Sequence, residues 1–134
     1  MTEPAPLTHV VIESDPQYDD PAPIRILPGQ VVTVTQETAT EFPAFVHVTT
    51  PRGEGWVPRR HLDGARPAAA VLRAYDTTVL MPQVGDRVAA VEEDTDSGWT
   101  WCRDQVGREG WVMTRALRPL SVGGGRINPV RISG

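Results

Sequence analysis

A ten-residue pattern occurs twice in this chain of 134 residues: Gly53-Glu54-Gly55-Trp56-Val57-Pro58-Arg59-Arg60-His61-Leu62 and, 55 positions later, Arg108-Glu109-Gly110-Trp111-Val112-Met113-Thr114-Arg115-Ala116-Leu117. A second pair of stretches lies upstream: Pro28-Gly29-Gln30-Val31-Val32-Thr33-Val34 and, 56 positions later, Val84-Gly85-Asp86-Arg87-Val88-Ala89-Ala90. The difference of one position requires a single insertion in a loop, where changes of length are tolerated. The chain is therefore predicted to contain a tandem repeat.

Each repeat is predicted to consist of short strands. Val32 and Val34 alternate with threonines, and Val46 and Val48 flank His47, which is the period of a half-buried strand. A barrel is favoured because closure protects the edges of a short sheet. A unit of roughly 60 residues buries only about 60% of its unfolded surface, so two such units are expected to pack together. The predicted fold class is all-β, with two small β-barrels in tandem, packed together.

Composition and charge exclude several classes of function. The formal net charge of −4 argues against a nucleic-acid partner, and no stretch approaches the roughly 20 apolar residues of a membrane-spanning helix. The first residues lack the basic and apolar regions of a secretory signal, so a cytoplasmic location is expected. Isolated histidines and the single cysteine, Cys102, predict no metal site and no cofactor. Without a nucleophile and an oriented base, an enzyme is not expected.

Four short motifs in the second repeat stand in a familiar order: Arg73-Ala74-Tyr75-Asp76-Thr77, Gly85-Asp86, Gly98-Trp99-Thr100-Trp101-Cys102 and Gly107-Arg108-Glu109-Gly110-Trp111-Val112-Met113. Together they resemble the Src-homology-3 domain, including its bacterial forms. The resemblance implies tandem Src-homology-3-like barrels over residues 8–63 and 68–120, the first more divergent. Residues 121–134, which begin near a triple glycine, are predicted to form a flexible tail.

The resemblance also implies a groove that docks Pro-x-x-Pro peptides in the polyproline II form. In the second unit Tyr75 and Trp99 fall on groove positions, Trp101 extends the aromatic shelf, acidic residues precede Trp99, and Met113 replaces the groove proline. The first unit keeps Pro58 and places His61 at a groove tyrosine, with Pro43 near the tryptophan position. The residues predicted to contact a ligand are Tyr75, Trp99, Trp101, Glu93, Asp94, Asp96, Met113, Pro58 and His61.

Neither unit has a complete groove, so we consider a composite surface across the junction of the two units. An aromatic pair beside carboxylates would attract an Arg through cation–π and ion-pair interactions. By contrast, Trp56 and Trp111 are predicted to pack across strands. Cys102 is predicted to be a small core residue with Val46 as its counterpart.

The predicted function is therefore a non-catalytic module that docks a protein or peptide, Arg-containing or Pro-rich, on the aromatic and acidic face of the second barrel. Two alternatives stay open: an accessory subunit that packs on a larger enzyme or assembly, and a module that recognises the cell wall. A further hypothesis is that the tail segment 126–132 docks on an acidic and aromatic groove.

Overall fold

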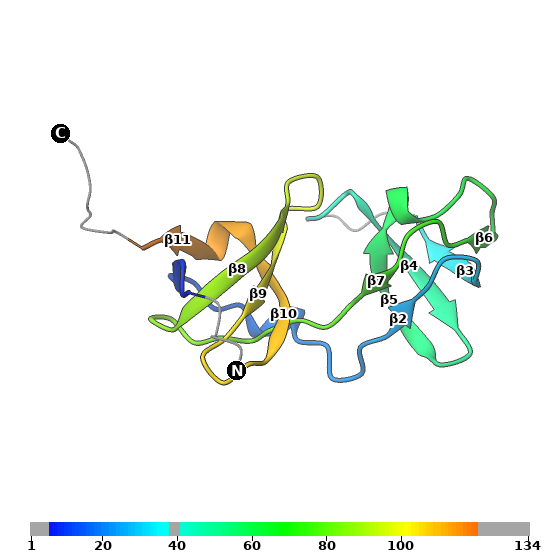
Figure 1. Ribbon diagram of the computed structural model, residues 1–134. Coiled ribbons are helices and arrows are strands. Elements are labelled where there is room, and N and C mark those ends of the chain that lie inside the picture. Colours follow the sequence, from blue (N-terminus) through cyan, green and yellow to red (C-terminus); the bar gives the residue numbers. More distant parts are fainter. Residues whose placement is uncertain (1–5, 38–40, 121–134) are drawn as a thin grey trace.

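The computed structural model describes residues 6–37 and 41–120, which form an all-β protein without an α-helix in these ranges (Figure 1). The predicted tail, 121–134, lies outside the described residues. Three short 3-10 helices, η1 (Pro16–Tyr18), η2 (Arg59–His61) and η3 (Thr114–Ala116), connect strands. The strands are β1 (His9–Val11), β2 (Arg25–Ile26), β3 (Val31–Gln36), β4 (Phe45–Thr50), β5 (Gly53–Pro58), β6 (Ala68–Ala70), β7 (Tyr75–Asp76), β8 (Arg87–Asp94), β9 (Trp99–Arg103), β10 (Glu109–Met113) and β11 (Leu117–Pro119).

The strands form three sheets, two of which occupy opposite ends of the molecule (Figure 1). The five-stranded sheet has the order β10-β9-β8-β1-β11, the four-stranded sheet the order β5-β4-β3-β6, and β2 pairs with β7. The β-rich class is thus confirmed, but none of these sheets closes into a barrel. The two edge strands of each large sheet do not pair with each other. Instead, a 3-10 helix connects them along the chain: η2 follows Pro58 and leads from β5 to β6, and η3 follows Met113 and leads from β10 to β11.

The strand β1, dark blue in Figure 1, lies between β8 and β11 although it comes from the other end of the sequence. Val11 donates its N–H to the carbonyl of Asp86 at 2.8 Å and accepts the N–H of Gly85 at 2.8 Å. In the four-stranded sheet Val71 makes the matching bonds, to Gln30 at 2.8 Å and from Gly29 at 2.9 Å. Each sheet therefore takes its first strand from the sequence range predicted for the other unit, and the ranges 8–63 and 68–120 are interleaved.

Two segments of the chain cross between the sheets as a result of this exchange. Residues 12–24 run from β1 to β2, and residues 72–86 run from β6 to β8 (Figure 1). They meet where β2 pairs with β7, with Ile26 opposite Tyr75. Next to this pair, Thr77 donates its N–H to the carbonyl of Ile24 at 2.9 Å and accepts the N–H of Ile24 on its hydroxyl at 2.8 Å. The crossing segments thus tie the sheets together midway along the molecule.

Strand register shows the internal repeat directly. Both long strands carry a bulge at the same place, at Thr35 between β3 and β4 and at Val91 between β8 and β9. Trp56 stands opposite His47 as Trp111 stands opposite Trp101. The same positive φ recurs in the turns that precede β3 and β8, at Gly29 (91°) and Gly85 (95°), where only glycine adopts the conformation freely.

The register corrects two of the predicted counterparts. Val48, not Val46, matches Cys102, because Val48 pairs with Gly55 and Cys102 with Gly110. Phe45, not Pro43, matches Trp99, since Phe45 pairs with Pro58 and Trp99 with Met113. A single insertion does not account for this. Between matched positions of the register, the stretch from Gln36 to Phe45 is two residues longer than the stretch from Glu92 to Trp99. The stretch from Thr49 to Glu54 is one residue shorter than the stretch from Arg103 to Glu109.

The buried side chains form one cluster that extends through both sheets. Val46, Val48 and Val57 fill the four-stranded side, while Val88 and Cys102 fill the five-stranded side, all of them fully buried. The outward-facing residues of β3 are exposed, as the alternation of a half-buried strand requires, whereas in β8 both Val88 and its neighbour Ala89 are buried.

Replacing Val11 by alanine should lower the free energy of unfolding by about 2 kcal/mol, because it removes two methyl groups from a site that is only 1% exposed. Ile12→Ala is the matched control: Ile12 is 36% exposed, and its loss should cost less than about 1 kcal/mol. Urea unfolding followed by tryptophan fluorescence measures both. Equal costs would mean that β1 does not lie between β8 and β11 in solution.

Candidate functional site

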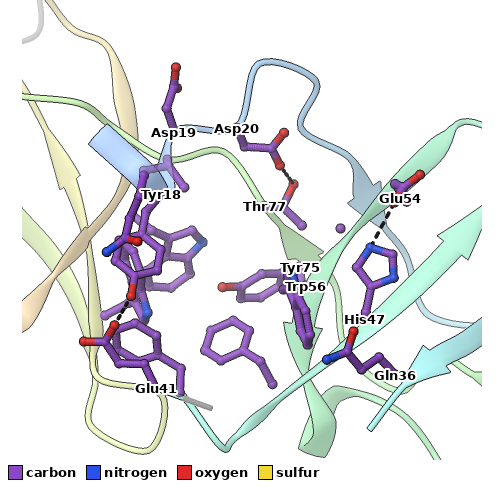
Figure 2. A pocket seen from close by; sticks show the side chains of 17 residues that line it. Tyr18, Asp19, Asp20, Gln36, Glu41, His47, Glu54, Trp56, Tyr75 and Thr77 are labelled. Atoms are coloured by element: carbon purple, nitrogen blue, oxygen red, sulfur yellow. Dashed lines mark hydrogen bonds and ion pairs between the residues drawn. The ribbon is translucent and has the colours of Figure 1, made fainter. Parts of the chain in front are cut away.

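A cavity of about 570 Å³ lies between the two large sheets, alongside the crossing segments (Figure 2). Both sheets and both crossing segments contribute to its wall. The lining residues are Gln17, Tyr18, Asp19, Asp20, Gln36, Glu41, Phe42, Phe45, His47, Glu54, Gly55, Trp56, Tyr75, Thr77, Val79, Trp99 and Trp111.

Aromatic rings in mutual contact make the floor of this cavity. Tyr75 stacks on Trp111 with ring centroids 5.4 Å apart and 13° between the planes. Phe42 packs against Trp99 at 5.2 Å and against Phe45 at 6.4 Å. Tyr18 meets both Phe42 and Trp99 edge to face at 5.6 Å. Because these rings come from both sheets and both crossings, the floor exists only when the sheets are joined.

Four carboxylates surround the floor: Asp19, Asp20, Glu41 and Glu54. Asp20 accepts the hydroxyl of Thr77 at 3.4 Å, and Glu54 lies 3.1 Å from the imidazole of His47 (Figure 2). Within the described ranges, no Lys or Arg contributes to the lining. The cavity therefore presents negative charge above electron-rich ring faces.

The protonation states of Tyr18 and Glu41 are fixed by their hydrogen bond. Tyr18 donates its hydroxyl to the Glu41 carboxylate, which raises the pKa of Tyr18 to about 12. The same bond, together with one from Arg115, lowers the pKa of Glu41. Burial raises the pKa of Tyr75 well above its usual value. At neutral pH both phenols stay protonated and the carboxylate stays charged.

Two arginines in equivalent places connect each 3-10 helix to the opposite half of the molecule. Arg60 in η2 reaches the turn after β8, where it donates to Asp94 at 2.6 Å and to Asp96 at 3.0 Å. Arg115 in η3 reaches Glu41, which follows β3. Burial alone would raise the pKa of Asp94, but hydrogen bonds from Arg60 and Ser97 outweigh burial and lower it. These pairs hold the halves together across the cavity.

The structure brings two of the predicted ligand residues, Tyr75 and Trp99, together in the cavity. Trp99 is only 7% exposed, so most of its ring packs in the core. Trp101 lies outside the lining, where it contacts Trp111 at 5.2 Å and donates its indole N–H to Glu109 at 2.9 Å. A continuous shelf of Trp99 and Trp101 is therefore not formed at the cavity.

The other predicted residues lie beneath or beside the cavity. Pro58 and Met113 are buried, and His61 packs edge to face on Tyr75 at 5.2 Å, where burial and the charge of Arg60 lower the pKa of the imidazole. Asp94 and Asp96 are engaged by Arg60, and Glu93 is exposed outside the lining. These acids thus do not border the aromatic floor.

Sequence reasoning missed Tyr18, Asp20, Glu41, Phe42 and Phe45. One signal was available, because an aromatic residue adjoins acids in both Tyr18-Asp19-Asp20 and Glu41-Phe42. Phe45 was not recognised because the sequence alignment of the two repeats matched Pro43, and not Phe45, with Trp99. The acidic rim comes from the crossing segment and from the four-stranded half, not from the run before Trp99.

The single cysteine of the chain is buried in the core. Burial raises the pKa of the Cys102 thiol to about 12, so it stays protonated. Among residues 6–37 and 41–120, no three His, Cys, Asp or Glu side chains gather closely enough to hold a metal ion. In the same ranges, no helix has the length and hydropathy required to cross a membrane. Comparison of the chain with family models, curated proteins and solved structures gives no match.

The ion pair between Arg60 and Asp94 should contribute to stability. Asp94→Asn should lower the free energy of unfolding by about 1–2 kcal/mol at pH 7, since the carboxylate is 10% exposed and bonded to a guanidinium. Asp96→Asn, at a carboxylate that is 63% exposed, should change it by less than about 0.5 kcal/mol.

The dependence on pH provides a second measurement. Because the pKa of Asp94 is lowered on folding, its contribution is present above the ordinary value of 3.8 and is lost as the pH falls through the lowered value. Urea unfolding at pH 7 and at pH 2.5 should therefore show the cost of Asp94→Asn shrinking in acid. A cost that stays constant between these pH values would contradict the role given to this pair.

Proposed function

We propose that this chain is a non-catalytic docking module, built from two Src-homology-3-like units, that holds a cationic side chain of a protein or peptide partner in the cavity between its sheets. One observation carries the proposal: an aromatic floor bordered by Asp19, Asp20 and Glu54, which pair with no arginine among the described residues, with no Lys or Arg in the described lining. A ring face attracts a cation, most strongly where water is excluded. The carboxylates add charge-assisted hydrogen bonds.

Arginine suits this cavity better than lysine. A planar guanidinium stacks on a ring while its edge donates to a carboxylate, which an ammonium group cannot do at the same time. The wall offers partly exposed rings in Trp56 and Trp111 and an acceptor in Asp20. The volume of about 570 Å³ exceeds one side chain and leaves room for part of the backbone that bears it.

Two features support Src-homology-3-like units. The shared bulge and the 3-10 helices after Pro58 and Met113 give both halves the same sequence of local structures. The groove positions Tyr75 and Trp99, both assigned to the second unit, line one cavity. The cavity is less suited to a Pro-rich ligand, because Pro58 and Met113, which would form the wall of a polyproline groove, are buried.

N-acetyl-arginine amide should bind this cavity, and the neutral N-acetyl-glutamine amide should not. Titration followed by NMR should shift the indole N–H signals of Trp99 and Trp111 with the first compound alone. Affinity should fall as salt rises, because the attraction is electrostatic. Equal shifts with both compounds would contradict a site for cations.

Two single-charge variants separate the cavity from the general surface charge. Asp20→Asn removes a carboxylate from the lining and should weaken the binding of N-acetyl-arginine amide by up to about fivefold. Glu93→Gln removes the same charge at an exposed position outside the lining and should leave the affinity within about twofold. If both variants weaken binding equally, the cation does not occupy this cavity.

A further inference from the structure

The outer edge of β10 is occupied by another part of the same chain. Trp111 donates its N–H to the carbonyl of Thr78 at 2.9 Å, and its carbonyl accepts the N–H of Leu80 at 3.0 Å. Val79 lies between these bonds in a parallel bridge with Trp111. The segment runs so close that a Cβ on Gly110 would lie 2.6 Å from the nitrogen of Leu80. The segment Thr78–Leu80 thus covers the outer edge of β10 through an isolated parallel bridge.

The equivalent edge of β5 has no such strand in the part of the chain that the structure describes. Trp56 pairs with His47 as Trp111 pairs with Trp101, so the backbone N–H and C=O of Trp56 also point away from the neighbouring strand. By position, Ile24 corresponds to Leu80, but Ile24 donates its N–H to the hydroxyl of Thr77. The crossing segment pairs with β7, and the side chains of Thr77 and Ile24 lie 3.3 and 3.5 Å from where a Cβ on Gly55 would be, but no described residue forms a backbone hydrogen bond with the outer edge at Trp56.

This open edge faces the cavity. Glu54, Gly55 and Trp56 are consecutive in β5 and all line it, and Figure 2 shows Trp56 and Glu54 on one wall, with Asp20 and Thr77 above Tyr75. In a paired strand, the residue opposite Trp56 carries its side chain on the same face as the indole. A side chain at that position would therefore point over the aromatic floor, between carboxylates.

We propose that an extended segment of a partner protein, bearing an arginine, adds to the edge of β5 as a parallel strand and places that arginine in the cavity. The inference rests on the proposed function and adds the mode of binding. Thr78–Leu80 on β10 is the internal example of the geometry. Asp19, Asp20 and Glu54, which have no arginine partner among the described residues, favour a cationic occupant over an acidic or neutral one. Backbone bonds to Trp56 would supply affinity that a lone side chain lacks.

The probe is the peptide acetyl-Thr-Val-Arg-Val-Thr-amide, tested on the full chain by calorimetry. In the geometry of Thr78–Leu80, the amide of the residue after the arginine donates to the carbonyl of Trp56, while the amide of the arginine itself points outward. N-methylation of the residue after the arginine should therefore weaken binding about tenfold, because it removes a hydrogen bond and adds bulk at the edge. N-methylation of the arginine is the matched control and should change the affinity less than about twofold.

Hydrogen exchange at the Trp56 amide is an independent measurement. The amide should exchange fast in the free chain and at least about tenfold more slowly with saturating peptide, because it gains a carbonyl partner. An unchanged rate would overturn the added strand. An amide already protected without peptide would also overturn it, since the edge would then be filled by this chain or by a second copy.

The outcomes distinguish this inference from the proposed function. Equal loss with both methylated peptides, or a peptide that binds no more tightly than N-acetyl-arginine amide, overturns the added strand and leaves the cation site standing. Failure of both the peptide and N-acetyl-arginine amide overturns the two together. Tenfold selectivity between the methylated peptides, with protection of the Trp56 amide, supports the added strand.

Discussion

The hydrogen bonds of Val11 to Asp86 and Gly85 seat a strand from the beginning of the chain inside a sheet otherwise made of residues 87–119. Val71 makes the same bonds in the other sheet. Once both strands are exchanged, the chain must cross twice between the sheets, and the cavity can form only where those crossings run. The seating of these two short strands is therefore the constraint on which the remaining structure depends.

Charge is distributed around this junction in two ways. Arg60 and Arg115 neutralise acids that join the halves, so Asp94, Asp96 and Glu41 act in holding the molecule together. Among the residues that the structure describes, the side-chain partner of Asp20 is a hydroxyl, and the side-chain partner of Glu54 is an imidazole. The difference explains why the acidic run before Trp99 is not the rim of the cavity. Its charges are already matched by an arginine of the opposite half.

Departures from internal symmetry mark the candidate site. The segment Thr78–Leu80 covers the edge of β10, whereas the matching residues near Ile24 are held by Thr77. The two halves share strands, bulges and 3-10 helices but differ at this point. Phe45 and Trp99 are equivalent by register and both line the cavity, so the same position in each repeat supplies one ring to it. The repeat thus accounts for the pair of rings at Phe45 and Trp99. The local difference between the two halves accounts for the edge of β5 that no backbone segment covers among the described residues.

Local pattern determined the β class, the repeat and the burial of residues such as Val32, Val48 and Val88, because the alternation of a strand is written in neighbouring residues. Tyr75 and Trp99 were also found as members of the candidate site from sequence. Which strand enters which sheet was decided only in the tertiary structure. Val11 and Val71 stand in similar short apolar stretches, so the sheet that each one enters depends on long-range pairing that no local pattern encodes. The same holds for the partners of Asp94 and for the open edge at Trp56, since an ion pair or an edge between distant segments exists only after the chain has crossed.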